Sequence, residues 1–302
     1  MSDIKHQDVK HIENYELLAK QLVEGFITGL HRSPYHGFSV EFAEHKQYNV
    51  GESTRHIDWK AYAKTDRLYV KRYEEETNLR CTILIDNSSS MRYPSAEKGK
   101  IRFALQAASG LIYLLQRQRD AVGLVSFSEG IDMETAVKST GSHAHSLFNQ
   151  LNTIYNEQVE ERNTNIPEVL HKLAKSIHKR SLVVVLSDLI NSSSDLDDVF
   201  KALQHLKHKK HEILLFHIKD AETEDDFEFS DLPHVFVDLE TKEKIHLNPG
   251  ELKEEYKKQR EEFKKKIYMK CHQNRIDLIE ADINEGVNEI LRAYLIKRKR
   301  ML

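Results

Sequence analysis

Cysteine is scarce in this sequence. The 302 residues include only Cys81 and Cys271, which lie far apart and form no C-x-x-C motif. This pattern excludes a disulfide framework and gives no sign of a structural zinc site. A chain of this size is long enough to bury a substantial core without such cross-links. We therefore expect a folded protein of a reducing compartment, the cytoplasm.

Long apolar runs are also absent. Runs such as LVVVL and ILLF are far too short to cross a bilayer. The N-terminal stretch MSDIKHQDVKHIENYELL contains no apolar secretory segment. The sequence therefore predicts a soluble chain without a transmembrane segment.

A large excess of charge of either sign is missing too. The 45 Lys and Arg residues face 48 Asp and Glu residues, which gives a formal net charge of -3. No overall field draws such a chain to nucleic acid or to anionic lipid. The basic tail Lys297–Arg300 is a local exception, and we expect it to complement the negative end of a terminal helix. We therefore predict no nucleic-acid partner.

Apolar periodicity predicts the elements that are present. Residues 12–30 carry apolar side chains at helical spacing, and residues 38–80 alternate in short β-like stretches such as FSVEF and LYVKRYEEE. From residue 79 onward, the runs CTILID, AVGLVSF, SLVVVLSD and EILLFHI have the pattern of strands that are buried on both faces. Helical patterns separate these runs, at 101–115, 143–156, 166–178 and 195–209.

This alternation of strands and helices predicts an α/β fold. We expect a doubly wound, mostly parallel sheet, with an N-terminal helix and a β-hairpin extension. The acidic stretch DAETEDDFEFSD is interpreted as a solvated loop and VFVDLETKEKIHL as a hairpin. A helix at 250–273, a strand IDLIEADI and a helix at 285–300 complete the chain. We predict two parts, residues 1–78 packed on the core and a domain at 79–302.

Oxygen-bearing side chains follow the ends of two predicted core strands. Asp86, Ser88 and Ser90 follow CTILI, and Asp188 follows SLVVVLS. A third candidate, Thr164, precedes the 166–178 helix. Because loops at the carboxyl ends of parallel strands converge, we expect these groups to face one crevice.

Carboxylate and hydroxyl oxygens are hard ligands, suited to Mg²⁺, Mn²⁺ or Ca²⁺. The D-x-S-x-S spacing allows a tight turn to aim Ser88 and Ser90 at the same point as Asp86. Each piece also has a structural explanation, because Ser and Asp are common in turns and helix caps. Asn165 with Glu168 forms a capping-box pattern that accounts for its loop without a metal.

At these residues the sequence resembles the von Willebrand factor A fold and its metal-ion-dependent adhesion site. The resemblance covers about residues 79–300. It implies a divalent cation, Mg²⁺ or alternatively Mn²⁺ or Ca²⁺, and a protein partner that supplies a Glu or Asp. The ligands that it implies are Asp86, Ser88, Ser90, Thr164 and Asp188.

The preceding segment VGESTRHIDWKAYAKTDRLYVKRYEEE is similar to the signature of the bacterial family catalogued as domain of unknown function 58. Membership implies a protein often paired with a MoxR-type AAA ATPase that acts as a chaperone. Within the signature, Trp59 with its neighbours is either an anchor for a partner or a buried structural plug. The signature residues of interest are Arg55, Asp58, Trp59 and Lys60.

Three functions are compatible with these features. The first is a non-catalytic, metal-dependent interaction module, and the second is a structural adaptor whose metal site is vestigial. The third is a metal-dependent phosphohydrolase of the aspartyl-phosphate type, which requires a second acid two residues after the nucleophile. Because Ser88 occupies that place, we expect no enzymatic activity.

Overall fold

The computed structural model describes residues 14–30, 45–47, 62–63, 65–66, 68–71, 79–95, 99–157, 163–178, 180–189, 196–230, 232–239 and 242–301. The chain forms two compact units. Met1–Phe26 and Leu79–Leu302 make up the first, and Ile27–Asn78 make up the second. In the second unit, β1 (His45–Gln47) pairs antiparallel with β2 (Tyr69–Lys71). The packing of residues 27–78 on the core stays a prediction.

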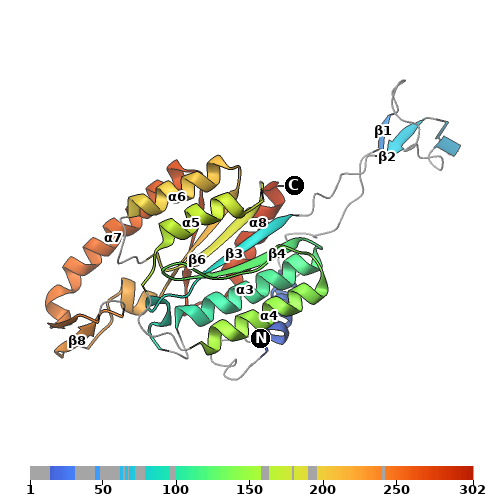
Figure 1. The fold of residues 1–302 in the computed structure, drawn as a ribbon. Coiled ribbons are helices and arrows are strands. Elements are labelled where there is room, and N and C mark those ends of the chain that lie inside the picture. The colour runs from blue at the N-terminus through green and yellow to red at the C-terminus, as the bar shows by residue number, and fades with distance from the viewer. Residues whose placement is uncertain are drawn as a thin grey trace. The chain divides into compact units, whose positions relative to one another are not determined.

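A six-stranded sheet forms the centre of the larger unit (Figure 1). Its strand order is β10-β7-β6-β3-β4-β5, and every neighbouring pair is parallel except β4 with β5. The predicted α/β, mostly parallel sheet is therefore confirmed. The strands are β3 (Arg80–Asp86), β4 (Ala121–Phe127), β5 (Ile131–Glu134), β6 (Leu182–Ser187), β7 (Glu212–Lys219) and β10 (Asp277–Asp282).

Helices cover both faces of this sheet (Figure 1). Apolar side chains of α5, α6 and α7 pack in one core cluster with alternate residues of the strands, such as Val183 and Val185. On the other face α3 contacts β3, β4 and α8, and α4 packs beside α3. The helices are α3 (Lys100–Arg117), α4 (Gly141–Asn156), α5 (Ile166–Ser176), α6 (Leu196–His208), α7 (Pro249–Gln273) and α8 (Asn288–Met301).

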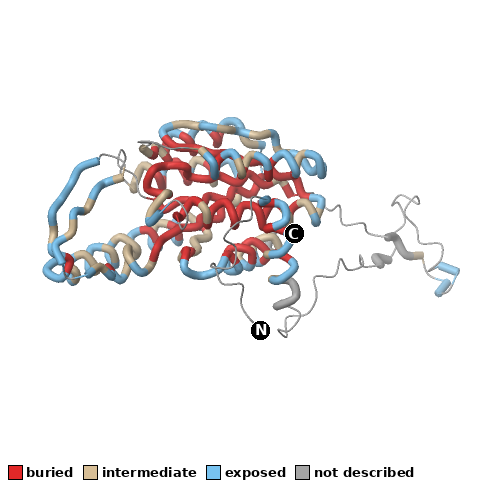
Figure 2. Tube along the Cα trace, turned by 90° about the horizontal axis from the view of Figure 1, so that it is seen from below, coloured by how far each residue is buried: buried red, intermediate tan, exposed pale blue. Residues whose placement is uncertain are grey.

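The N-terminal helix α1 (Tyr15–Leu30) packs against α4. The ring of Tyr15 meets that of Tyr155 edge to face, with centroids 6.3 Å apart, and Glu16 accepts a hydrogen bond from His145. The predicted hairpin is also present, as β8 (His234–Val237) paired with β9 (Lys244–Leu247). This hairpin and the first half of α7 are largely exposed (Figure 2).

Two segments differ from the sequence-based prediction. Strand β5 was not expected, because its IDME run is only four residues long. The interpretation of DAETEDDFEFSD as a solvated loop is wrong in part: Ala221–Asp225 form a π-helix, η4, and Asp220 before it is buried. Glu224 and Asp225 on this turn are only 13% exposed, because cationic side chains from other elements enclose them.

The basic tail is tied to the unit itself. Lys297 pairs with both Glu212 and Asp277, and Arg298 pairs with the buried Asp120. Within the described part of the chain, no helix is both long and apolar enough to cross a membrane. The signature residues Arg55, Asp58, Trp59 and Lys60 lie outside the described residues.

Candidate functional site

Asp86 ends β3 at the carboxyl edge of the sheet and is completely buried. The chain then turns sharply, because the amide of Ser88 donates to Oδ1 of Asp86 at 3.1 Å. The turn leads into a short 3-10 helix, Ser90–Arg92, and leaves the hydroxyls of Ser88 and Ser90 3.0 Å apart. The D-x-S-x-S segment therefore gathers its oxygens at one point, as the spacing predicts.

Two further hydroxyls reach Asp86 from other elements. Thr164 Oγ1 donates to Asp86 Oδ1 at 3.2 Å, and Ser187 Oγ donates to Asp86 Oδ2 at 2.6 Å. Thr164 is buried beside the start of α5, where the side chain of Asn165 accepts from the amide of Glu168. The predicted cap and the contact to Asp86 therefore coexist. Ser187 was missed, although a serine at the end of an otherwise apolar β6 is a usable signal.

Asp188 follows Ser187 directly and is also completely buried. Its Oδ2 accepts a hydrogen bond of 2.6 Å from the ammonium of Lys100, which also lies 2.7 Å from Oε1 of Glu224. Lys100 is 1% exposed at the start of α3. Sequence reasoning missed Lys100 as well. The sequence feature that could have identified it is a single charged residue at helical spacing from the apolar residues of α3.

The start of α3 is fixed by a close approach of the backbone. Gly99 precedes Lys100, and a Cβ on Gly99 would lie 2.8 Å from the carbonyl oxygens of both Arg92 and Ser95. Only glycine fits there without a shift of the backbone. The loop after Asp86 and the first turn of α3 are thus held together, and this holds the Lys100 side chain beside Asp188.

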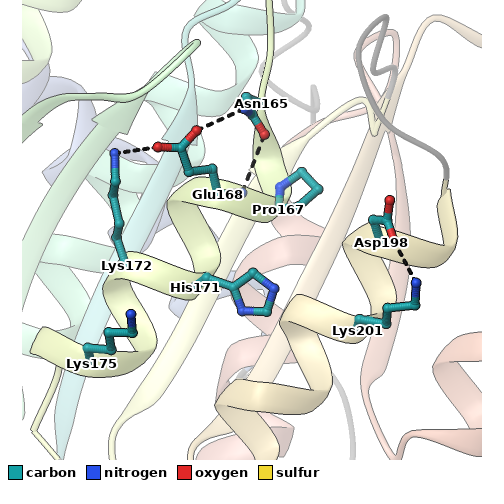
Figure 3. A pocket seen from close by; sticks show the side chains of 8 residues that line it. All are labelled: Asn165, Pro167, Glu168, His171, Lys172, Lys175, Asp198 and Lys201. Atoms are coloured by element: carbon teal, nitrogen blue, oxygen red, sulfur yellow. Dashed lines mark hydrogen bonds and ion pairs between the residues drawn. The ribbon is translucent and has the colours of Figure 1, made fainter.

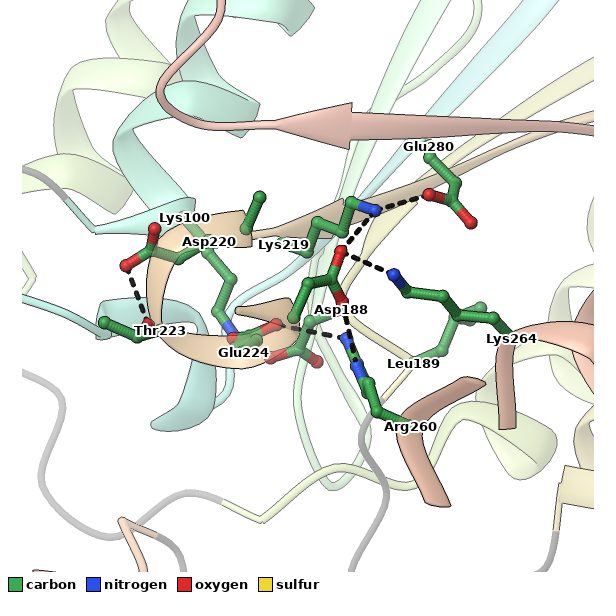
Figure 4. A network of polar contacts seen from close by, with 12 residues as sticks. Lys100, Asp188, Leu189, Lys219, Asp220, Thr223, Glu224, Arg260, Lys264 and Glu280 are labelled. Carbon is green, nitrogen blue, oxygen red and sulfur yellow. Dashed lines mark hydrogen bonds and ion pairs between the residues drawn. The ribbon is translucent and has the colours of Figure 1, made fainter. Parts of the chain in front are cut away.

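The Lys100–Asp188 pair is one end of a larger ion-paired network (Figure 4). Helix α7 contributes Arg260, which bonds to Glu224 and Asp225, and Lys264, which bonds to Asp225. From β7, Lys219 pairs with Asp225 and with Glu280 of β10. We call this the acid–base network. Its members are Lys100, Lys219, Arg260, Lys264, Asp188, Glu224, Asp225 and Glu280.

The electrostatics of the two aspartates differ. Burial, together with the nearby charge of Asp188, raises the pKa of Asp86 to about 7, although hydrogen bonds from Ser187 and Ser88 oppose this. Burial opposes the charge of Lys100, but Asp188 and Glu224 hold its pKa above its usual value. The lysine therefore stays charged and balances Asp188. The hydrogen-bond partners of Asp86 within the described residues are hydroxyls and an amide, none of them charged.

This donor set fits a hard divalent cation. The candidate ligand oxygens are two carboxylates and three hydroxyls, contributed by Asp86, Ser88, Ser90, Thr164 and Asp188, and such oxygens suit Mg²⁺, Mn²⁺ or Ca²⁺. The buried, unbalanced carboxylate of Asp86 is the group that a cation would compensate. No cluster of three or more His, Cys, Asp or Glu side chains suited to a metal occurs in the described ranges.

A separate hollow of about 540 Å³ lies on the surface between α5 and α6 (Figure 3). Charged side chains line it, but Lys172 pairs with Glu168 and Lys201 pairs with Asp198. It thus presents paired surface charges and no converging set of groups, and we do not assign it a chemical role.

The curated relatives that match are described as uncharacterized proteins. An uncharacterized protein of Mycobacterium tuberculosis is 23% identical over 180 residues, which are 59% of this chain and 56% of that protein. A protein of Mycobacterium bovis matches equally well. The chain thus spans about half the length of the curated relatives that it matches.

Among solved structures, the conserved hypothetical protein BatB of Bacteroides thetaiotaomicron is similar with a TM-score of 0.45 and 13% identity. The similarity covers 74% of this chain and 98% of BatB. An aerotolerance-related membrane protein of Bacteroides fragilis gives a TM-score of 0.42 and 15% identity, over 72% of this chain and 99% of that one.

The family model described as "Protein of unknown function DUF58" matches residues 44–267. This range includes the signature segment and all the candidate ligands. The resemblance drawn from the signature is confirmed, and the chain belongs to this family.

Proposed function

We propose that the chain is a non-catalytic, divalent-metal-dependent protein-interaction module. Asp86, Ser88, Ser90, Thr164 and Asp188 would hold the cation, Mg²⁺ in the first instance. A bound cation supplies an open coordination position, which a Glu or Asp of the partner completes. Binding of the partner would then require both the metal and that acid.

One observation carries the proposal. The buried Asp86 accepts hydrogen bonds from the hydroxyls of Thr164, before α5, and Ser187, at the end of β6, and from the amide of Ser88, and it has no partner of opposite charge among the described residues. A buried carboxylate without a counter-charge is costly, and a divalent cation removes that cost. The surrounding hydroxyls add neutral oxygens of the kind that Mg²⁺ accepts.

The non-catalytic part of the proposal rests on position 88. A phosphohydrolase of the aspartyl-phosphate type needs an acid there to protonate the leaving group. In this chain the position is Ser88, whose hydroxyl bonds to that of Ser90. The partner itself is proposed from the family resemblance alone, as a MoxR-type AAA ATPase.

The test is a calorimetric titration of Mg²⁺ and then Mn²⁺ into the protein, the Asp86→Ala variant and a control. Asp198→Ala is the matched control, because Asp198 is an exposed aspartate on α6 that pairs at the surface with Lys201. We expect saturable binding that only Asp86→Ala abolishes. Binding of a MoxR-type ATPase should disappear in chelator and in Asp86→Ala while the fold persists.

A specific observation favours a second candidate, a structural adaptor with a vestigial site. The Lys100 ammonium already pairs with one oxygen of Asp188, so a positively charged side chain occupies part of the candidate metal site. On this alternative the acid–base network serves the fold, and other surfaces contact the partner. Partner binding that persists both in chelator and in the Asp86→Ala variant would support the structural adaptor.

A further inference from the structure

The Lys100 side chain connects the candidate metal site to the acid–base network. Its ammonium lies between two carboxylates, 2.6 Å from Asp188 and 2.7 Å from Glu224, and is shielded from water. Glu224 in turn bonds through its second oxygen to Arg260. A charge at this depth is retained only with such partners.

The charges of the network balance without Asp86. Four cationic side chains face four carboxylates, and Asp188 is one of those four. The charge of Asp188 is therefore matched before any metal is considered. A divalent cation at the site would meet one unbalanced negative charge, that of Asp86, and one positive charge would remain in surplus.

We propose that Lys100 is a built-in counter-ion that holds Asp188 and so makes binding of the divalent cation depend on a carboxylate from outside the chain. This deepens the proposed function and rests on it. The surplus positive charge is what an external carboxylate neutralises. Lys100 thereby weakens the hold of the site on the metal alone and strengthens its selection for metal together with an acidic partner.

The role predicts opposite effects for two substitutions. In Lys100→Met, Asp188 loses its counter-charge and its carboxylate becomes available to the metal. Mn²⁺ alone should therefore bind to this variant at least about tenfold more tightly than it binds to the unaltered protein. In Glu224→Gln, Lys100 loses its second carboxylate and is held by Asp188 alone. Mn²⁺ alone should then bind more weakly, and its dependence on added carboxylate should increase.

The matched control is Lys264→Met. It removes the same charge from the same network, but at Asp225, where Lys264 is bonded. Its Mn²⁺ affinity should change by less than about threefold, since the lost charge does not touch Asp188. The assay is calorimetric titration of Mn²⁺ in sodium acetate and in sodium chloride of equal ionic strength. Acetate serves as the external carboxylate.

We expect acetate to tighten Mn²⁺ binding to the unaltered protein and to have a smaller effect on Lys100→Met. Equal Mn²⁺ affinity and equal acetate dependence in the unaltered protein, Lys100→Met and Glu224→Gln would overturn the role of Lys100 and leave the metal site itself intact. Absence of Mn²⁺ binding from every protein in both salts would overturn the proposed function as well. If Lys100→Met does not fold, the role of Lys100 is tested by the weaker Mn²⁺ binding expected of Glu224→Gln.

Discussion

Replacement of Asp86 by asparagine should alter how stability depends on pH. The pKa of Asp86 is raised from 3.8 to about 7 in the folded chain, first by burial and then by Asp188. Between these two values the folded state holds a proton that the unfolded chain has lost. The free energy of unfolding of the metal-free protein should therefore fall as pH rises from about 4 to about 7, then level off.

The size of this effect follows from the same pKa values. The interval from 3.8 to about 7, at about 1.4 kcal/mol for each pH unit, limits the loss to about 4 kcal/mol. The asparagine of the variant stays neutral and escapes that loss. Its amide nitrogen replaces one oxygen that accepts from Thr164 or Ser187, but the cost of that change is the same at every pH. The informative quantity is thus the pH dependence of the stability difference.

The assay is urea unfolding of the protein and of Asp86→Asn, in chelator, at intervals from about pH 4.5 to about pH 8.5, which spans the interval over which the carboxyl titrates. We expect the variant to gain stability relative to the unaltered protein as pH rises. At the high end of this pH range, added Mg²⁺ should restore the stability of the unaltered protein and leave that of the variant unchanged. Titrating groups that do not interact with Asp86 act equally in both proteins and cancel. A stability difference that is flat across this range would refute the electrostatic account of Asp86.

Two further outcomes follow from the packing around the site. Gly99→Ala should destabilise the fold by about 1 to 3 kcal/mol in urea unfolding, because its Cβ would lie 2.8 Å from two backbone oxygens; an unchanged midpoint would contradict the close approach. Burial lowers the pKa of His217 to about 4, so the unfolded chain takes up a proton first and stability should fall as pH drops from 6.5 towards 4. His217→Leu should lack that slope, and retention of it would place the effect elsewhere.

Local periodicity was sufficient to predict most of the larger unit. The continuous apolar runs are strands of the central sheet, and the spacing of Ile101, Ala104 and Leu105 marks the buried face of α3. The π-helix at 221–225 could not be predicted in this way. Its acids form an enclosed turn because Arg260 and Lys264 approach from a helix far along the chain, and composition alone describes only a polar stretch.

The candidate site, too, could be predicted from the sequence only in part. Asp86 and Asp188 could be placed together, because parallel strands bring their carboxyl ends to one edge of a sheet. Lys100 and Glu224 could not, since neither follows a core strand directly and they lie 124 residues apart in sequence. Their meeting depends on how α3 and η4 pack, which no local pattern encodes. Sequence reasoning therefore identified the candidate metal ligands and missed the counter-ion.

The contrast between the two aspartates bears on why the site exists. Asp188 is a buried carboxylate whose charge is compensated by a buried cation, so the cost of an unpaired buried charge is avoided. Asp86 has the arrangement that stability disfavours, because it is fully buried among neutral donors. An asparagine would fill nearly the same space without that penalty. The presence of an acid at this position is what a cation-binding role accounts for, and a purely structural role leaves it unexplained.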